Sequence, residues 1–226
     1  MTTIGFIGSG NIGGTVARLA LAAGYEVVLS NSRGPQTLKE LVDELGPGAA
    51  AATPAEAAAA GGLVVVSVPL RAYLDVPAEP LAGKTVLDTN NYYPERDGTF
   101  PELDSGSTTS SELLQRHLTM SKVVKVFNNI YFRHLRALAR PSGAADRSAL
   151  AIAGDDAGAK GEVTTFLDRI GYDTVDAGAL ADGWRFQPGT PSYGFAYAGG
   201  IENFWESPGV PADAAALRAK LADARR

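Results

Sequence analysis

A short apolar run, Ile4–Ile7, leads directly into Gly8-Ser9-Gly10-Asn11-Ile12-Gly13, which matches the pattern G-x-G-x-x-G. Apolar side chains then recur at helical spacing from Ile12 to Ala23, and a second apolar run, Tyr25–Leu29, follows. A strand, a glycine turn, a helix and a second strand within about 30 residues are typical of a dinucleotide-binding unit. This feature constrains the chain more than any other, and it predicts a Rossmann unit at the N-terminus.

Each glycine of the motif has its own expected role. Gly8 makes the tight turn, Gly10 lets the backbone approach a pyrophosphate, and Gly13 lets the helix pack closely on the strand. The free N–H groups at the helix start favour an anion there. The competing interpretation is a glycine-rich turn that binds nothing.

The end of the second strand predicts which dinucleotide binds. An NAD site usually places Asp or Glu there to hold the ribose 2′-hydroxyl. Here the chain reads Asn31-Ser32-Arg33-Gly34, without an acid. Ser32 can donate a hydrogen bond, and Arg33 can donate a charge-assisted one to a 2′-phosphate. We therefore expect NADP(H) rather than NAD(H), although Arg33 can also be read as a solvated loop charge.

Further apolar runs alternate with helical patterns up to about Asp176. Strands are expected at Leu63–Val68, Lys84–Leu87, Lys122–Phe127, Leu150–Ala153 and Tyr172–Val175. Helices are expected at Thr37–Leu45, within Ala49–Ala60 after a Thr53–Glu56 capping box, and at Ser110–Leu118, His134–Leu138, Ala157–Ile170 and Asp213–Arg225. Strands that are apolar on both faces predict an α/β fold, a doubly wound and mostly parallel sheet of about eight strands.

The tail differs from the rest of the chain. We place a Rossmann domain at residues 1–179 and a C-terminal segment at residues 180–226, which covers the cleft, contributes to a dimer, or does both. The tail is rich in aromatic residues, among them Phe195, Tyr197, Phe204 and Trp205. These exceed what a small appendage buries alone, so we expect a homodimer. The alternative is that they fold back on the edge of the sheet.

The composition narrows the class of protein. The chain of 226 residues has no cysteine, which excludes a disulfide framework and a thiol nucleophile, and its net charge is −5. A nucleic-acid partner is therefore not expected, nor is a membrane partner, because the apolar runs are too short to span a bilayer. No cluster of metal ligands is visible. A soluble protein of the cytoplasm is the resulting expectation.

Ligands of a parallel sheet bind at the carboxyl ends of its strands. The residues that follow those ends, and that we expect near the cofactor, are Val68, Pro69, Asn90, Asn128, Asn129 and Ile130. Gly154-Asp155-Asp156 is a fourth such end, although Asp156 is better explained as a helix cap. Tyr92, Tyr131 and His134 are the candidates for a proton donor, but no catalytic residue is assigned.

With these motifs in place, the chain resembles the F420-dependent NADP oxidoreductase family over roughly residues 2–185. The resemblance is carried by an ordered set: Gly8–Gly13, Asn31-Ser32-Arg33, Val68-Pro69, Asn128-Asn129-Ile130, Ala153–Asp156 and Asp176-Ala177-Gly178. It implies hydride transfer between NADP(H) and the deazaflavin coenzyme F420, and a homodimer. It also implies that Ser9, Asn11 and Ile12 contact the phosphates, that Ser32 and Arg33 bind the 2′-phosphate, and that Ile130 lies beside the nicotinamide.

The chain departs from the family pattern where the second substrate is expected, at Asn128, at Tyr131 and in the tail. Gly34-Pro35-Gln36 also replaces a basic stretch after the arginine. Two other functions therefore stay open. One is an NADPH-dependent reductase of a small carbonyl or imine, and the other is a non-catalytic NADP-binding redox sensor.

Overall fold

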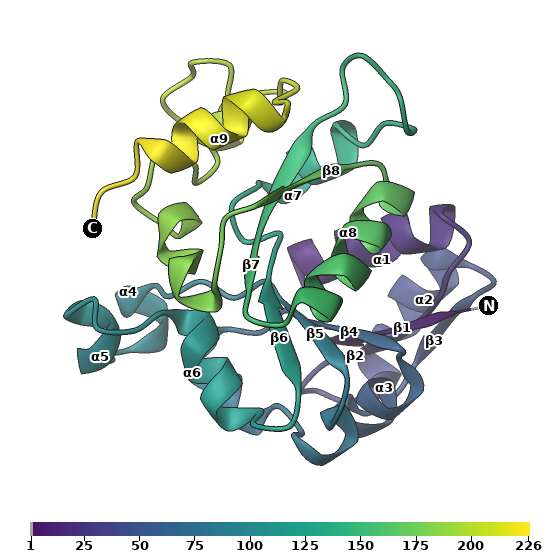
Figure 1. The fold of residues 1–226 in the computed structure, drawn as a ribbon. Helices are drawn as coiled ribbons and strands as arrows, with labels where there is room; N and C mark the ends of the chain where they lie inside the picture. Colours follow the sequence, from purple (N-terminus) through teal and green to yellow (C-terminus); the bar gives the residue numbers. More distant parts are fainter. Residues whose placement is uncertain (1) are drawn as a thin grey trace.

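The structure is a computed structural model that describes residues 2–226. Within these residues eight strands form one sheet in the order β3-β2-β1-β4-β5-β6-β7-β8 (Figure 1). The strands are β1 Thr3–Ile7, β2 Glu26–Ser30, β3 Ala49–Ala51, β4 Leu63–Val66, β5 Thr85–Asp88, β6 Lys122–Lys125, β7 Ala149–Gly154 and β8 Asp173–Asp176. The prediction of a doubly wound, mostly parallel sheet is confirmed.

Helices cover both faces of this sheet (Figure 1). They are α1 Asn11–Ala22, α2 Lys39–Leu45, α3 Pro54–Ala60, α4 Pro94–Asp97, α5 Pro101–Asp104, α6 Ser110–His117, α7 Phe132–Ala137, α8 Ala157–Ile170 and α9 Ala214–Ala222. The 3₁₀ helices, labelled η1 to η6 in chain order, are Pro35–Leu38, Leu70–Asp75, Glu79–Leu81, Leu180–Phe186, Phe195–Tyr197 and Phe204–Glu206. Helices α1, α7 and α8 contribute to the core on one face, and α3 and α6 to the core on the other.

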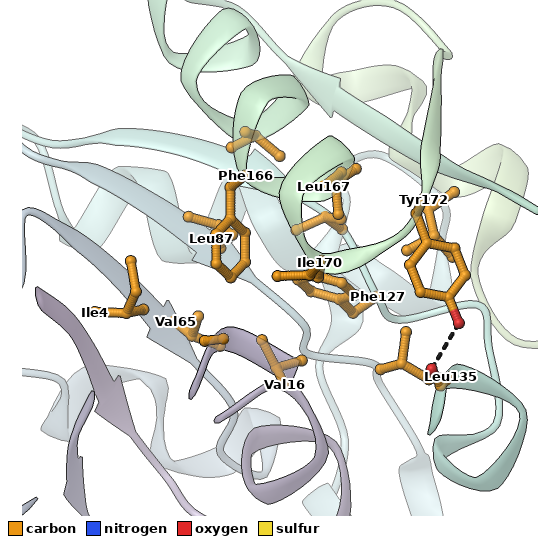
Figure 2. Close-up of a cluster of buried hydrophobic side chains, with 14 of the residues drawn as sticks. Ile4, Val16, Val65, Leu87, Phe127, Leu135, Phe166, Leu167, Ile170 and Tyr172 are labelled. Carbon is orange, nitrogen blue, oxygen red and sulfur yellow. Dashed lines mark hydrogen bonds between the residues drawn. The ribbon is translucent and has the colours of Figure 1, made fainter. Parts of the chain in front are cut away.

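The larger core lies between the sheet, α1 and α8 (Figure 2). Strand residues such as Ile4 and Val65 meet Val16 of α1, while Phe166 and Ile170 descend from α8. Strands buried on both faces must be apolar throughout, which explains the near-continuous apolar runs in the sequence. This core fixes where α1 begins, and with it the position of the glycine turn.

The direction of β7 departs from the parallel sheet expected from the alternation. Strands β1 to β6 are parallel, β7 is antiparallel to β6, and β8 is parallel to β7. The residue after β7, Asp155, therefore lies at the opposite edge of the sheet from the other candidate strand ends. There Asp156 caps α8 by accepting from the Ala159 N–H at 2.8 Å, which confirms its interpretation as a cap.

One strand was not expected. Ala49–Ala51, read as the lead-in to a helix, pairs with β2 as the edge strand β3. Alanine has a low intrinsic preference for strands, so the pairing rather than the local sequence makes this strand. The Thr53–Glu56 capping box at the start of α3 is present as predicted.

The C-terminal segment packs back on the molecule. Leu217 and Leu221 of α9 join a small core with β7 and β8. Tyr197 is fully buried, and its hydroxyl donates to the Ala149 carbonyl at 2.7 Å. Phe195 and Trp205 stay exposed. The tail aromatics thus fold back only in part. Among residues 2–226, no helix has the length and apolar character needed to cross a membrane.

Substituting a buried leucine and an exposed leucine by alanine should change the free energy of unfolding by different amounts. Leu167 is fully buried in α8, whereas Leu74 is 62% exposed. Leu167→Ala should lower the free energy of unfolding by about 2–5 kcal/mol, because it removes transfer energy and leaves a cavity. Leu74→Ala should change it by less than about 0.5 kcal/mol. Urea denaturation followed by circular dichroism measures both. Equal losses would contradict this core assignment.

Candidate functional site

Two neighbouring cavities open at the carboxyl edge of the parallel strands. The first cavity has a volume of about 330 Å³ and is lined by three turns, including Gly8, Ser9, Gly10, Asn31, Ser32, Arg33, Val68 and Pro69. The second cavity has a volume of about 310 Å³ and is lined by the start of α1 and the segments after β5 and β6, including Asn11, Ile12, Asn91, Asn128, Asn129 and Ile130. Gly10 lines the first cavity and Asn11 the second, so the two cavities lie next to each other at the start of α1.

The glycine turn has the geometry that a diphosphate requires. Gly8 has φ +98°, and a Cβ there would lie 2.1 Å from the Ser67 carbonyl oxygen. A Cβ on Gly13 would lie 2.3 Å from the Gly8 carbonyl oxygen, so helix and strand touch at this point. A Cβ on Gly10 would meet nothing within 4 Å, and no side chain caps α1. The turn therefore leaves open space in front of uncapped N–H groups, which fits a diphosphate.

The loop after β2 presents Ser32 and Arg33 to solvent at the rim of the first cavity. Asn31 organises this loop, since its Nδ2 donates to the Thr37 hydroxyl at 2.8 Å and its Oδ1 accepts the Arg33 N–H at 2.9 Å. The loop itself carries no acid, and the acidic side chain that lines this cavity, Asp75, comes from η2. A ribose phosphate near Arg33 would thus meet a cation on this loop.

Asn90 lines neither cavity but connects two of the strand ends. It is buried, and its Oδ1 accepts the Val68 N–H at 3.0 Å. Its own N–H donates to Asp88 Oδ1 at 2.9 Å, and its carbonyl accepts from Lys125 Nζ at 3.0 Å. Asn90 Nδ2 has no partner within the described residues. Its evident task is to hold the turn at Val68, which lines the first cavity.

Two fully buried ionisable side chains hold Asn90 in place. Lys125 Nζ donates to Ser111 Oγ at 3.2 Å, and Ser111 Oγ in turn donates to Asp88 Oδ2 at 2.5 Å. Burial raises the pKa of the Asp88 carboxyl and lowers the pKa of the Lys125 ammonium, because each loses its hydration. Sequence reasoning missed this pair, although a lysine inside an apolar strand run was a visible signal.

The turn after β6 lies against the C-terminal segment. Phe127 has φ +64°, which costs a bulky residue about 1–3 kcal/mol and often marks a functional turn. Asn128 Nδ2 donates to the Phe186 carbonyl at 2.8 Å, and Asn129 Nδ2 donates to the Ser192 carbonyl at 3.2 Å. The Oδ1 atoms of both asparagines are buried without partners within residues 2–226. The two amides thus fix the tail beside Ile130.

Aromatic side chains form much of the second cavity. Tyr93, Tyr131, Phe132, Tyr193 and Phe204 all line it. The hydroxyls of Tyr93 and Tyr193 are hydrogen-bonded to each other, and the Arg96 guanidinium lies 4.7 Å from the Tyr93 ring centroid. Neither tyrosine was a predicted site residue. Tyr93 follows a strand end closely, but nothing local in the tail distinguishes Tyr193.

The three proton-donor candidates lie in different surroundings. The Tyr92 hydroxyl donates to Asp104 at 2.8 Å in a loop outside both cavities. His134 is fully buried, and its Nε2 hydrogen-bonds the Ser207 carbonyl at 2.9 Å, so it ties α7 to the tail. Tyr131 lines the second cavity, and the structure gives its hydroxyl no hydrogen bond to residues 2–226. Of the three, only Tyr131 faces a space that a substrate can enter.

A family profile described as "NADP oxidoreductase coenzyme F420-dependent" matches residues 3–92. This stretch contains the glycine turn, the Arg33 loop and the turn after β4. The resemblance stated from the sequence is therefore confirmed, and so is the prediction of an NADP-linked oxidoreductase at that level. The match to F420 itself goes no further than the name of the family.

Three relatives extend the comparison. Protein YjhV of Escherichia coli K12 is 43% identical over 53 residues, which are 24% of this chain and about two fifths (39%) of that protein. Protein SMa0349 of Sinorhizobium meliloti has a crystal structure with 29% identity, a TM-score of 0.71, and coverage of 84% of this chain and 91% of that one. A crystal structure from Arthrobacter sp. FB24, provisionally named an F420-dependent NADP reductase, shares 29% identity at a TM-score of 0.67, with coverage of 79% and 85%.

Alanine substitutions at Gly13 and at Gly10 should have different effects, the first on stability and the second on NADP⁺ binding. Gly13→Ala should destabilise the protein, because its Cβ would overlap the Gly8 carbonyl. Gly10→Ala should leave the melting temperature unchanged and weaken NADP⁺ binding by about tenfold or more, since its Cβ would occupy the space of the diphosphate. Differential scanning fluorimetry and calorimetric titration measure the two effects. Unchanged NADP⁺ affinity in Gly10→Ala would place the diphosphate elsewhere.

Proposed function

We propose that this protein transfers a hydride between NADP(H) and the deazaflavin coenzyme F420. The observation that carries the proposal is the pair of adjacent cavities at one strand edge. The first is lined by the glycine turn and the Ser32–Arg33 loop, which offer the contacts that a dinucleotide with a 2′-phosphate requires, and the second has the size of a small-ligand pocket beside Ile130. A protein that only senses NADP(H) has no need of this second space.

The chain offers a distinct contact for each part of NADP(H). The N–H groups at the start of α1, with Ser9, would hold the diphosphate, and Ser32 with Arg33 would hold the 2′-phosphate. Val68 and Pro69 would lie beneath the ribose and nicotinamide. Bound NADPH would supply the hydride, which is chemistry that no side chain offers.

The second cavity can hold a planar ring next to the nicotinamide. Ile130 is buried to 4% exposure and forms an apolar wall, and aromatic side chains line the space in front of it. Hydride transfer between two rings depends on their distance and orientation more than on an acid or a base. This agrees with a cavity in which no acid–base constellation is assembled.

A basic groove borders both cavities. The groove has a volume of about 790 Å³ and lies between α1 and α7. It shares Asn11 and Phe132 with the second cavity, and Ser9 and Gly10 with the first. Arg133 and Arg136 line it, are exposed, and pair with no acid within the described residues. Arg18 also lines it but is paired with Glu44 at 2.8 Å. These cations favour a second substrate with an anionic tail, as F420 has.

One observation favours a second candidate function. The unpaired hydroxyl of Tyr131 in the second cavity can donate to a carbonyl or imine, as a small-molecule NADPH-dependent reductase requires. This candidate does not use the basic groove, whereas the F420 proposal does. For that reason F420 remains the preferred second substrate.

The homodimer remains a prediction. Phe195 and Trp205 are 40% and 52% exposed on the C-terminal segment, and Ile201 nearby is 41% exposed. A second copy of the chain could cover this apolar surface, as proteins with exposed apolar patches often require.

The Arg33 assignment predicts a change in cofactor preference. Arg33→Ala should weaken NADPH binding by about 10- to 100-fold, because a charge-assisted contact to the 2′-phosphate is lost, and should change NADH binding by less than about twofold. Lys39→Ala is the matched control, since Lys39 is an exposed cation paired with Asp43 on the next helix. Fluorescence titration of both cofactors measures the effect. Equal weakening of NADPH and NADH would contradict the assignment.

The activity itself is tested by mixing the protein with NADPH and oxidised F420 and following the deazaflavin absorbance. We expect rapid bleaching with NADPH and little with NADH. Charge removal in an Arg133→Ala/Arg136→Ala double variant should raise the KM for F420 by a larger factor than it weakens NADPH binding, because the groove also borders Ser9 and Gly10 of the diphosphate turn. If NADPH binds but F420 is not reduced, the F420 proposal is wrong, and small carbonyls and imines become the substrates to test.

A further inference from the structure

Tyr93 and Tyr193 are one hundred residues apart in the chain, and their hydroxyls meet in the second cavity. Tyr93 comes from the segment after β5, and Tyr193 from the C-terminal segment. The main chain of that segment is fixed beside the pair, because the Gly194 N–H donates to the Asn129 carbonyl at 2.9 Å. The pair is therefore held from both sides, and neither ring depends on a ligand for its position.

A count of hydrogen atoms shows that this pair is incomplete. Two phenols carry two donor hydrogens, and the bond between them uses one. The Tyr93 oxygen also accepts from Asn91 Nδ2 at 3.5 Å, but this contact takes up a lone pair and not a hydrogen. No acceptor within residues 2–226 takes the remaining hydroxyl hydrogen. Whichever tyrosine donates to the other, one O–H is left to donate at the cavity wall.

Tyr193 is suited to stay protonated and to donate. Burial, and then the bond to Tyr93, raise the pKa of Tyr193, so its phenol keeps its hydrogen throughout the physiological range. The Arg96 guanidinium over the Tyr93 ring is held by its ion pair with the buried carboxylate of Asp97 at 2.8 Å. This contact fixes the Tyr93 ring rather than occupying its hydroxyl.

We propose that the Tyr93–Tyr193 hydroxyl pair donates a hydrogen bond to a carbonyl oxygen at the edge of a planar second substrate. The residues that line the second cavity indicate the class of ligand. Aromatic side chains, Tyr131 and Phe204 among them, surround the pair, and they favour a flat conjugated ring. A ring that accepts a hydride gains electron density on its conjugated carbonyl oxygens, so a donor fixed at that edge stabilises the charge as it develops.

This inference rests on the proposed function for the ring system, and it adds which residues recognise that ring. It also gives the C-terminal segment a role at the site, because Tyr193 comes from that segment. The pyrimidinedione carbonyls of a deazaflavin are acceptors of the required kind. Lumiflavin carries the same pyrimidinedione without any tail, so it probes the pair independently of the basic groove.

The test compares a Tyr93→Phe/Tyr193→Phe double variant with the wild type. Both substitutions keep the rings and remove the hydroxyls. Tyr92→Phe is the matched control, because Tyr92 is the neighbouring tyrosine and its hydroxyl bonds to Asp104 outside both cavities. Each protein is saturated with NADP⁺ and titrated with oxidised F420 and with lumiflavin, and the fluorescence of the ligand gives Kd. The affinity for NADP⁺ reports whether each variant is folded.

We expect the double variant to bind both probes about tenfold more weakly, with NADP⁺ affinity unchanged and Tyr92→Phe within about twofold of the wild type. If the double variant binds both probes as the wild type does, the inference is overturned. It is also overturned if the wild type binds neither. If the wild type fails to reduce F420 but lumiflavin binding still depends on the pair, the proposed function fails and the inference stands.

Discussion

The closeness of three backbone segments at the start of α1 is the constraint on which the site depends. At Gly8 and Gly13 an added Cβ would overlap the carbonyl oxygens of Ser67 and Gly8, respectively. Backbone contact of this kind leaves no room for adjustment, so the first turn of α1 has a fixed position relative to the ends of β1 and β4. Gly10, between these two contacts, is the point where the backbone faces open space. The same constraint thus packs the helix and exposes its N–H groups to an anion.

A buried charge network extends this rigidity to the neighbouring strands. Taking Asp88 and Lys125 out of water costs several kcal/mol per ion, which their mutual attraction and their hydrogen bonds must offset. Ser111 lies between them, and the backbone of Asn90 contacts both. Through Asn90 Oδ1 the network reaches Val68 at the end of β4. The ends of three strands are therefore held together by buried polar groups, and the cavity beside them is preorganised.

Much of the fold could be predicted from local patterns. The glycine motif, the Thr53–Glu56 capping box and the Asp156 cap follow from residues close in sequence, and the structure has the turn, helix starts and cap expected of them. The short strand Ala49–Ala51 could not be predicted, because it exists only through pairing with β2. The reversal of β7 could not be predicted from its connection either, because residues 126–148, which join β6 to β7, are numerous enough for a parallel crossover as well as for an antiparallel return. Only the pairing with β6 and β8 decides its direction.

The sequence by itself determined the nucleotide half of the site, since the glycine turn and the acid-free loop at Ser32 and Arg33 lie within one strand–helix–strand unit. Their geometry is set by local backbone conformation, which residue types encode directly. Only the tertiary structure decided the other half. In the folded chain His134 is buried, and the side chains of Tyr92 and Asn90 hydrogen-bond within the protein. The Tyr193 hydroxyl, from the C-terminal segment, hydrogen-bonds the Tyr93 hydroxyl. Contacts between residues one hundred positions apart depend on how the tail packs over β7 and β8, and no local pattern records that packing.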